Sequence, residues 1–174
     1  MNREEIIAKL RANYSSFGEF ILSLNETEFS TSPTGKWNAG QQLDHLIRAV
    51  SPLSTGLHVP KFVVKMLFGK ANRPSRSYEE LVKKYQSKLA AGGKAGGQFI
   101  PKKMKFYNKK RSLAKLSRKI NQLAKHTENY SEHQLDTFIL PHPLLGKVTM
   151  REMMYFTIYH AEHHHQQAIR NAGK

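Results

Sequence analysis

The chain has 174 residues, of which 39% are hydrophobic and 24% charged, and its formal net charge is +15. A chain of this length can bury roughly two-thirds of its unfolded surface in one core, so we expect residues 1–174 to form a single domain. The lack of cysteines excludes disulfides, thiolate metal ligands and a cysteine nucleophile. No apolar run approaches the roughly 20 residues of a membrane-spanning helix. The acidic N-terminus MNREEIIAKL is unlike a signal peptide, so we expect a cytoplasmic protein with no membrane partner.

Four capping boxes predict where helices begin. In a capping box the N-cap side chain accepts a hydrogen bond from the third helical amide, and the Glu or Gln at that third position accepts one from the N-cap amide. The pairs are Asn2/Glu5, Asn38/Gln41, Ser77/Glu80 and Thr149/Glu152, each followed by apolar residues at helical spacing.

In chain order, these signals predict long helices over residues 3–24, 39–50, 77–91, 112–126 and 150–172. The second helix is expected to end near Ser51-Pro52, and a short apolar helix over residues 60–69 is expected to cover one end of the structure. No strand is predicted, because the apolar run 138–140 is followed by Pro141 and Pro143.

This order of segments predicts an all-α protein, a four-helix bundle. Five long segments compete for four positions in such a bundle. We therefore expect the segments 77–91 and 112–126 to form one interrupted unit. The Gly-rich basic segment 92–111 would be an excursion between the middle helices.

The positive charge is concentrated in the middle of the chain. No acidic residue lies between Glu80 and Glu128, and residues 83–125 are rich in Lys and Arg. Such a segment is most often a solvated face, but it also attracts polyanions or an anionic substrate. Phe106 and Tyr107 lie among the lysines of residues 102–119, so nucleic-acid binding is an alternative hypothesis, although no recognised nucleic-acid motif supports it.

Two histidines near the C-terminus have metal-ligand spacing. His160 and His164 are four residues apart on a predicted helix, so their imidazoles share one face and can converge on one ion. The pair His160 and His163 is a geometric alternative, and residues 163–165 could also be a solvated helix end. His45 borders the predicted buried face of the second helix, where a lone histidine is more often a core residue than a ligand. We expect its neighbour Asp44 to be solvated.

Three short segments form an ordered set of motifs. They are GKWNAGQQLDHL at residues 35–46, HPLLG at residues 142–146 with Thr149, and HAEHHHQQ at residues 160–167. Together they resemble the DinB-like superfamily, the DinB/YfiT group of metalloenzymes: its second-helix motif, the loop before its last helix and its closing HxxxH with a nearby Gln. The resemblance covers residues 1–50 and 142–174, whereas residues 70–125 match no recognisable part of the family.

The resemblance implies a DinB/YfiT-like bundle whose metal ligands fall on His45, His160 and His164. Three further residues, Gln42, His163 and Gln167, would lie near these ligands and orient an imidazole or a bound water, with ordinary polar packing as the alternative. Some relatives transfer low-molecular-weight thiols such as bacillithiol or mycothiol to electrophiles. A thiol or another small-molecule substrate, and a homodimer, are therefore implied as well.

The chemistry expected of three neutral imidazoles is that of an open divalent metal site, with zinc or nickel the ions that suit these ligands. Such an ion activates water or a thiol. Glu152 belongs to a cap and Glu162 lies on a different helix face, so no carboxylate is placed as a general base and no catalytic side chain is assigned. This favours activation of the nucleophile by the ion itself, and the resemblance implies a metal-dependent S-transferase or hydrolase. The alternative is a non-catalytic metal-binding protein, or a nucleic-acid-binding one that uses residues 83–125.

Overall fold

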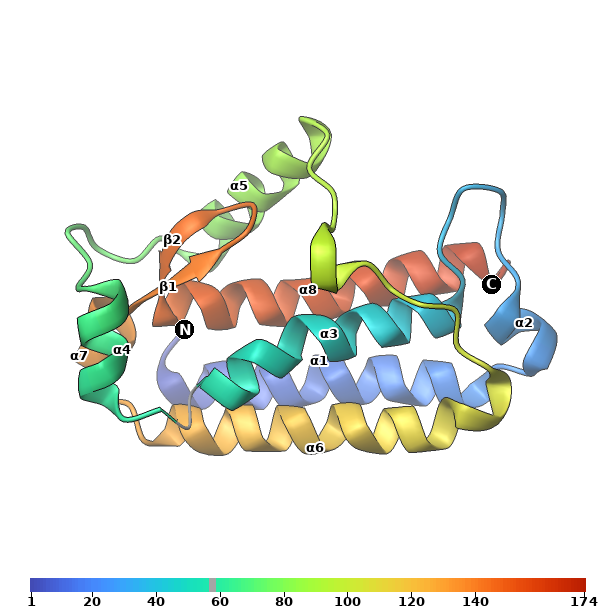
Figure 1. The fold of residues 1–174 in the computed structure, drawn as a ribbon, viewed down its shortest axis with the longest axis horizontal. Helices are drawn as coiled ribbons and strands as arrows, with labels where there is room; N and C mark the ends of the chain where they lie inside the picture. Colours follow the sequence, from blue (N-terminus) through green and yellow to red (C-terminus); the bar gives the residue numbers. More distant parts are fainter. Residues whose placement is uncertain (57–58) are drawn as a thin grey trace.

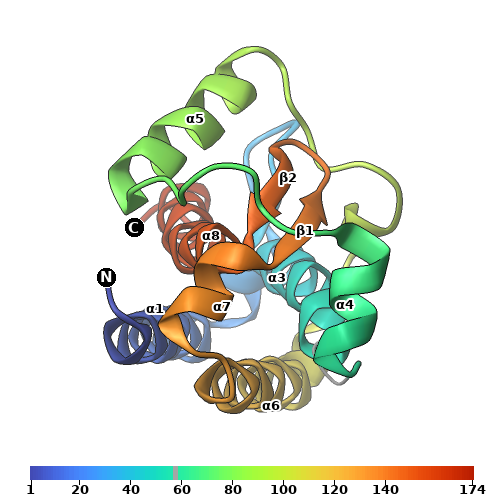
Figure 2. The ribbon, with the colours of Figure 1, turned by 90° about the vertical axis from the view of Figure 1, so that its left-hand side faces the viewer.

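The computed structural model describes residues 1–56 and 59–174. Four long helices lie side by side along the molecule (Figure 1), and Figure 2 shows them end-on around a common centre. They are α1 (Arg3–Ser23), α3 (Ala39–Gly56), α6 (Lys109–Glu128) and α8 (Met150–Asn171). The predicted all-α, four-helix architecture is confirmed.

The core lies between these four helices because each helix carries a stripe of apolar residues three or four positions apart. Burial of such side chains is the main favourable term in folding. Fully or almost fully buried members are Ile6, Leu10, Phe17 and Ile21 of α1; Leu43, Leu46 and Val50 of α3; Leu116, Ile120 and Leu123 of α6; and Met154 and Ile158 of α8.

The four predicted capping boxes are all present as reciprocal hydrogen bonds. Two further boxes, Asn25 with Glu28 and Ser131 with Gln134, begin short helices that were not predicted. The shorter elements are α2 (Glu26–Ser30), α4 (Lys61–Phe68), α5 (Tyr78–Ala90), α7 (Glu132–Thr137) and the 3-10 turns η1 (Gly97–Phe99) and η2 (Phe106–Asn108). In the part of the chain that the structure describes, no helix is long and apolar enough to cross a membrane.

Helix α5 is not part of the bundle, so the prediction that it joins α6 as one unit is wrong. It packs on the outer side of α8, while α6 packs against α1 and α3 (Figure 2). The reason is that α5 buries few side chains, Leu81 and Tyr85 among them, and these meet α8 rather than the central core. Helix α6, whose apolar stripe is longer, fills the fourth position alone.

Helix α3 continues past Pro52 to Gly56, although the sequence predicted an end near this proline. Proline removes one helical hydrogen bond, at a cost that tertiary packing can offset. Here Leu53 packs against the core and Ser54 is buried, so the last turn of α3 is held by contacts beyond the helix. The predicted short helix is present as α4, beside the same end of the bundle (Figure 1).

A two-stranded hairpin corrects the prediction that there is no strand. Strand β1 (Ile139–His142) pairs antiparallel with β2 (Gly146–Thr149), with Leu140 opposite Val148. Pro141 is tolerated because each strand of a two-stranded sheet has one free edge. The turn is closed by Gly146 at φ 74°, a left-handed conformation that favours glycine. The hairpin leads directly into α8.

The basic excursion after α5 crosses over α3 and is fastened there. The Asp44 carboxylate accepts from the amide of Lys102 at 2.8 Å and pairs with Arg48 at 2.6 Å, so the prediction that Asp44 is simply solvated is wrong. At the start of α6, the buried ammonium of Lys109 donates to the carbonyls of Leu22 and Leu24 at the end of α1. The excursion is thus fixed on both sides of η2.

Candidate metal centre

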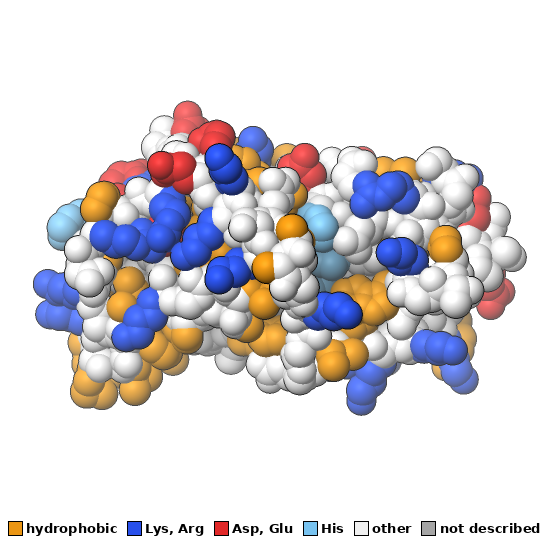
Figure 3. All heavy atoms as spheres, turned by 90° about the horizontal axis from the view of Figure 1, so that it is seen from above, with side chains coloured by type: hydrophobic (Ala, Val, Ile, Leu, Met, Phe, Trp, Pro, Cys, Tyr) orange, Lys and Arg blue, Asp and Glu red, His pale blue; other side chains and the backbone are white. Residues whose placement is uncertain are grey.

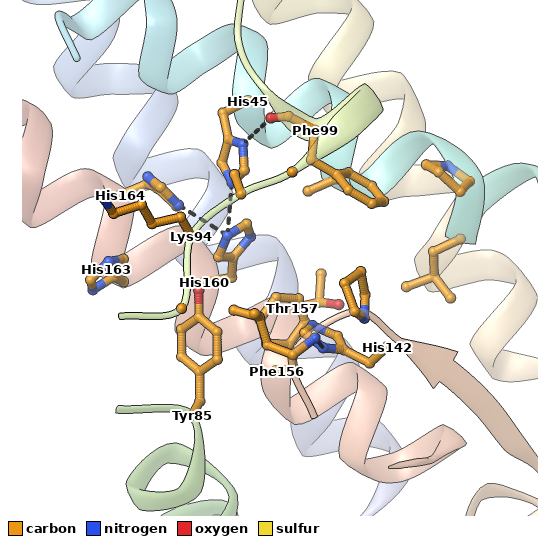
Figure 4. A pocket seen from close by; sticks show the side chains of 18 of the residues that line it. His45, Tyr85, Lys94, Phe99, His142, Phe156, Thr157, His160, His163 and His164 are labelled. Carbon is orange, nitrogen blue, oxygen red and sulfur yellow. Dashed lines mark hydrogen bonds between the residues drawn. The ribbon is translucent and has the colours of Figure 1, made fainter. Parts of the chain in front are cut away.

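Three histidine side chains meet in the interior between α3 and α8. Nε2 of His160 lies 3.1 Å from Nε2 of His45 and 3.0 Å from Nε2 of His164. One ring nitrogen from each of the three lies within 4.8 Å of the others, a grouping that could hold a metal ion. All three are buried, with at most 5% of their surface exposed. Figure 4 shows the rings turned toward one another at the side of a cavity. The structure thus brings together the three predicted ligands.

Hydrogen bonds at the far side of two rings determine which nitrogen carries the proton. Nδ1–H of His45 donates to the carbonyl of Phe99 at 2.7 Å, and Nδ1–H of His164 donates to the side-chain oxygen of Gln42 at 2.5 Å. A neutral imidazole has one N–H, so both Nε2 atoms present lone pairs. His160 can donate to only one of them. At least one of these two Nε2 lone pairs therefore has no donor within the cluster, an arrangement that a cation would resolve.

The spacing of the nitrogens also suits a metal ion. Bonds of about 2.1 Å that meet at about 95° place two ligand nitrogens about 3.1 Å apart. Burial lowers the pKa of His45 and holds the pKa values of His160 and His164 well below their ordinary value. The imidazoles therefore stay neutral, as metal ligation requires. The residues present fit a divalent ion on donor type, spacing and protonation.

Aromatic rings fix the orientation of the three imidazoles. The Trp37 ring lies 5.0 Å from His45 and is stacked 6.1 Å from His164, centroid to centroid. The Phe156 ring is stacked 4.7 Å from His160. Rings held in this way cannot turn away without losing contact area, so the three Nε2 atoms are preorganised.

The three residues expected near the ligands form one hydrogen-bonded chain. Gln42, fully buried, accepts from His164 and donates to Gln167 at 3.2 Å. Gln167 in turn makes a 2.7 Å contact with Nε2 of His163. His163 is therefore turned toward Gln167, and the alternative pairing of His160 with His163 is not the one the fold assembles. His165 packs against Phe17 and Phe20, so the run 163–165 is not a solvated end.

Several residues of the site were not identified from the sequence. The Tyr85 hydroxyl reaches the cavity with its oxygen directed toward the His160 side of the cluster (Figure 4), and burial raises its pKa to about 12. The carbonyl of Phe99 accepts from His45, a backbone contact that no side-chain pattern reveals. Tyr85 occupies an apolar position of α5, and nothing in the sequence distinguishes it from a core residue.

His142, quoted above as part of a loop motif, also lines the cavity. Its Nδ1 accepts the amides of Leu144 and Leu145, both at 3.1 Å, so the neutral ring carries its proton on Nε2. Burial lowers the pKa of His142 to about 4. Among the residues that the structure describes, no protein group is bonded to that Nε2–H, which is therefore available to a molecule in the cavity.

The second and last long helices of this four-helix bundle bring three histidines together. These features define a class of helical proteins with an interior site that could hold a metal ion. Comparison with protein families assigns the chain within that class. The model of the DinB superfamily matches residues 9–168, and the chain belongs to this family. No curated protein matches the chain.

Proposed function

We propose that this protein is a metal-dependent enzyme in which His45, His160 and His164 bind one divalent ion, zinc or nickel. The observation that carries the proposal is the convergence of three buried Nε2 atoms of which two present lone pairs. Membership of the DinB superfamily supports it. A cluster of neutral imidazoles without an ion would leave at least one buried Nε2 lone pair without a hydrogen-bond donor, which costs free energy.

The chemistry proposed is activation of a thiol or water nucleophile, as in an S-transferase or a hydrolase. A divalent ion held by three neutral imidazoles keeps its full charge and lowers the pKa of a bound water or thiol. Among the described residues that line the cavity there is no Asp or Glu, so none of them provides a carboxylate base. This favours activation at the ion itself.

Two side chains of the cavity are placed to act on a bound substrate. The Tyr85 hydroxyl stays protonated because burial raises its pKa to about 12, and Nε2–H of His142 has no protein acceptor among the described residues. Both are donors that face the cavity. Fixed donors in a site shielded from water stabilise negative charge that develops on a substrate oxygen or leaving group.

Elemental analysis tests the proposal directly. Protein purified without a His tag or added metal is expected to hold about one divalent ion per chain. The double variant His160→Ala/His164→Ala is expected to hold none, whereas His133→Ala, which changes an exposed histidine elsewhere, should retain the ion. Metal-free protein that also fails to bind added zinc or nickel would refute the proposal.

Activity separates the enzyme from a non-catalytic metal-binding protein. The loaded protein is expected to hydrolyse a chromogenic ester or to transfer a small thiol to an aromatic halide, and the double histidine variant should do neither. Loaded protein that is inactive in both assays would favour the non-catalytic alternative. The nucleic-acid alternative has less support, because Phe106 packs against Phe29 and under the Lys109 ammonium and is not free to stack on a base.

A further inference from the structure

The cavity beside the histidines is much larger than an ion and a small nucleophile require. It has a volume of about 910 Å³, toward the upper end of the range for pockets that bind whole organic molecules. Its lining follows α8 from Met153 to Asn171, a distance of about 27 Å at 1.5 Å per residue. Figure 3 shows histidine side chains in a hollow of this face of the molecule. The site is therefore built for an elongated molecule.

The two ends of this cavity differ in chemistry. Helices α3 and α8 run antiparallel, so the second half of α3 and the first half of α8 lie at the same end, where α4 and the hairpin close over them. The walls at this end are apolar; they include Ala49, Leu53, Val64, Phe68, Leu140 and Met153. The metal centre lies between this end and the C-terminal end of α8.

Three cationic side chains lie beside the metal centre or between it and the C-terminal end of α8. Lys36 and Arg170 line the C-terminal end of the cavity beside Trp37, and the side chain of Lys94 extends alongside His164 in Figure 4. All three are exposed, and in the described part of the chain none of them forms an ion pair. Cations that no protein carboxylate neutralises are free to bind an anionic group of a ligand.

The charged side chains that the structure describes in the cavity wall all have the same sign. No Asp or Glu is among the described residues that line it, and the chain carries a net charge of +15. A cleft with low-dielectric walls and charge of one sign concentrates ligands of the opposite sign. The apolar end at the same time favours a ligand that has a sizeable apolar part.

We infer that the cavity binds an elongated amphipathic anion, that is, a molecule with an apolar chain or ring system and one acidic group. The acidic group lies among Lys36, Lys94 and Arg170, and the apolar body occupies the end formed by α4 and the hairpin. The middle of the molecule then passes the three histidines. That this molecule is the substrate rests on the function proposed above, whereas its binding does not require an ion.

Trp37 is the single tryptophan of the chain and lines the cavity, so its fluorescence reports occupancy. The probe is decane-1-sulfonate, kept below its micelle concentration. Its head group binds metals weakly, so it separates cavity binding from ligation. We expect saturable binding with one site per chain, about tenfold tighter than decan-1-ol and far tighter than methanesulfonate. Calorimetry provides a second measurement that does not depend on Trp37.

Variants test which end of the cavity binds the acidic group of the probe and which end binds its apolar chain. The double change Lys94→Gln/Arg170→Gln should weaken decane-1-sulfonate binding about tenfold and leave decan-1-ol unchanged, because exposed ion pairs contribute modestly. Ala49→Phe, which fills the apolar end, should weaken both probes. The control Lys119→Gln/Lys125→Gln removes two charges from α6, on the opposite side of the bundle (Figure 1), and should change neither.

The inference is overturned if decane-1-sulfonate causes no saturable change by either method. It is also overturned if decan-1-ol binds equally tightly, or if the α6 control weakens binding as much as the change at Lys94 and Arg170. The titration is run on EDTA-treated and on zinc-loaded protein. If the protein fails to bind metal, the sulfonate titration still tests the inference. If it fails to bind the sulfonate, the proposal that the histidines bind an ion is unaffected.

Discussion

Replacement of Gln42 by leucine tests whether the buried amide prepares His164 for metal binding. Leucine has a similar volume, so the packing between α3 and α8 is kept while the acceptor of the Nδ1–H bond is lost. His164 is then no longer held in the tautomer that presents the Nε2 lone pair to its partners. The change acts on the ligand through one hydrogen bond and does not remove a ligand.

The expected magnitude follows from the bond that is lost. Loss of a partner that orients a metal-bound histidine lowers metal affinity about 10- to 100-fold, which corresponds to about 1.4–2.7 kcal/mol. The metal-free protein should lose about 1–3 kcal/mol of unfolding free energy, because the Nδ1–H is left buried without an acceptor. The change also removes the 3.4 Å bond from the Gln42 amide to the carbonyl of Trp37. That carbonyl keeps the bond from Asn171, so it contributes little to the loss.

Competition with a chromophoric chelator measures the zinc affinity, and urea unfolding measures the stability. The variant Gln42→Glu keeps an acceptor for His164 and should retain most of the affinity. The control Gln166→Leu makes the same chemical change at an exposed position of α8 near the ligands and should alter neither quantity. Zinc affinity of Gln42→Leu within twofold of the unmodified protein would refute the orienting role of Gln42.

Three further predictions concern the scaffold and its pH dependence. Glu152→Ala should lower the unfolding free energy in urea by about 3 kcal/mol, because its fully buried carboxylate pairs with Arg73 and Arg76 and caps α8. In EDTA-treated protein, the pKa of His142 is about 4 in the folded state against an ordinary 6.5. As the pH falls, the unfolded chain therefore binds a proton at His142 before the folded protein does. Stability should therefore fall from pH 6.5 to pH 4, and less steeply in His142→Gln, as measured by urea unfolding at each pH. Gly40→Ala should lower the midpoint of thermal unfolding, at a cost of about 1–3 kcal/mol, because its Cβ would lie 2.8 Å from the buried Phe29 ring.

Two of these predictions have matched control variants, and the pH prediction has an outcome that contradicts it. Glu162→Ala, at an exposed position of α8, should change stability by less than about 0.5 kcal/mol, and an equal loss there would contradict the role given to Glu152. An unchanged pH slope in His142→Gln would show that the titrating groups lie elsewhere. Gly56→Ala, where an added Cβ meets no described atom within 4 Å, should not show the destabilisation expected at Gly40.

The sequence by itself determined where the long helical segments lie and which three histidines are the candidate ligands. Capping boxes and apolar spacing are local signals, because both depend on residues that are three or four positions apart in the chain. His160 and His164 could be paired for the same reason, since one helix fixes their separation. His45 was joined to them only through the resemblance of residues 35–46 and 160–167 to one family, because the contact spans two helices far apart in the chain.

Only the tertiary structure decided which helix fills the fourth place and what surrounds the three histidines. The apolar stripes of α5 and α6 both permit a place in the bundle, and long-range packing selects α6. The hairpin at β1 and β2 was missed because its pairing joins two four-residue segments, one of which contains a proline. The Phe99 carbonyl, the Tyr85 hydroxyl and the free cations of the cavity come together from separate elements. No local pattern encodes their convergence, because it results from the packing of the whole chain.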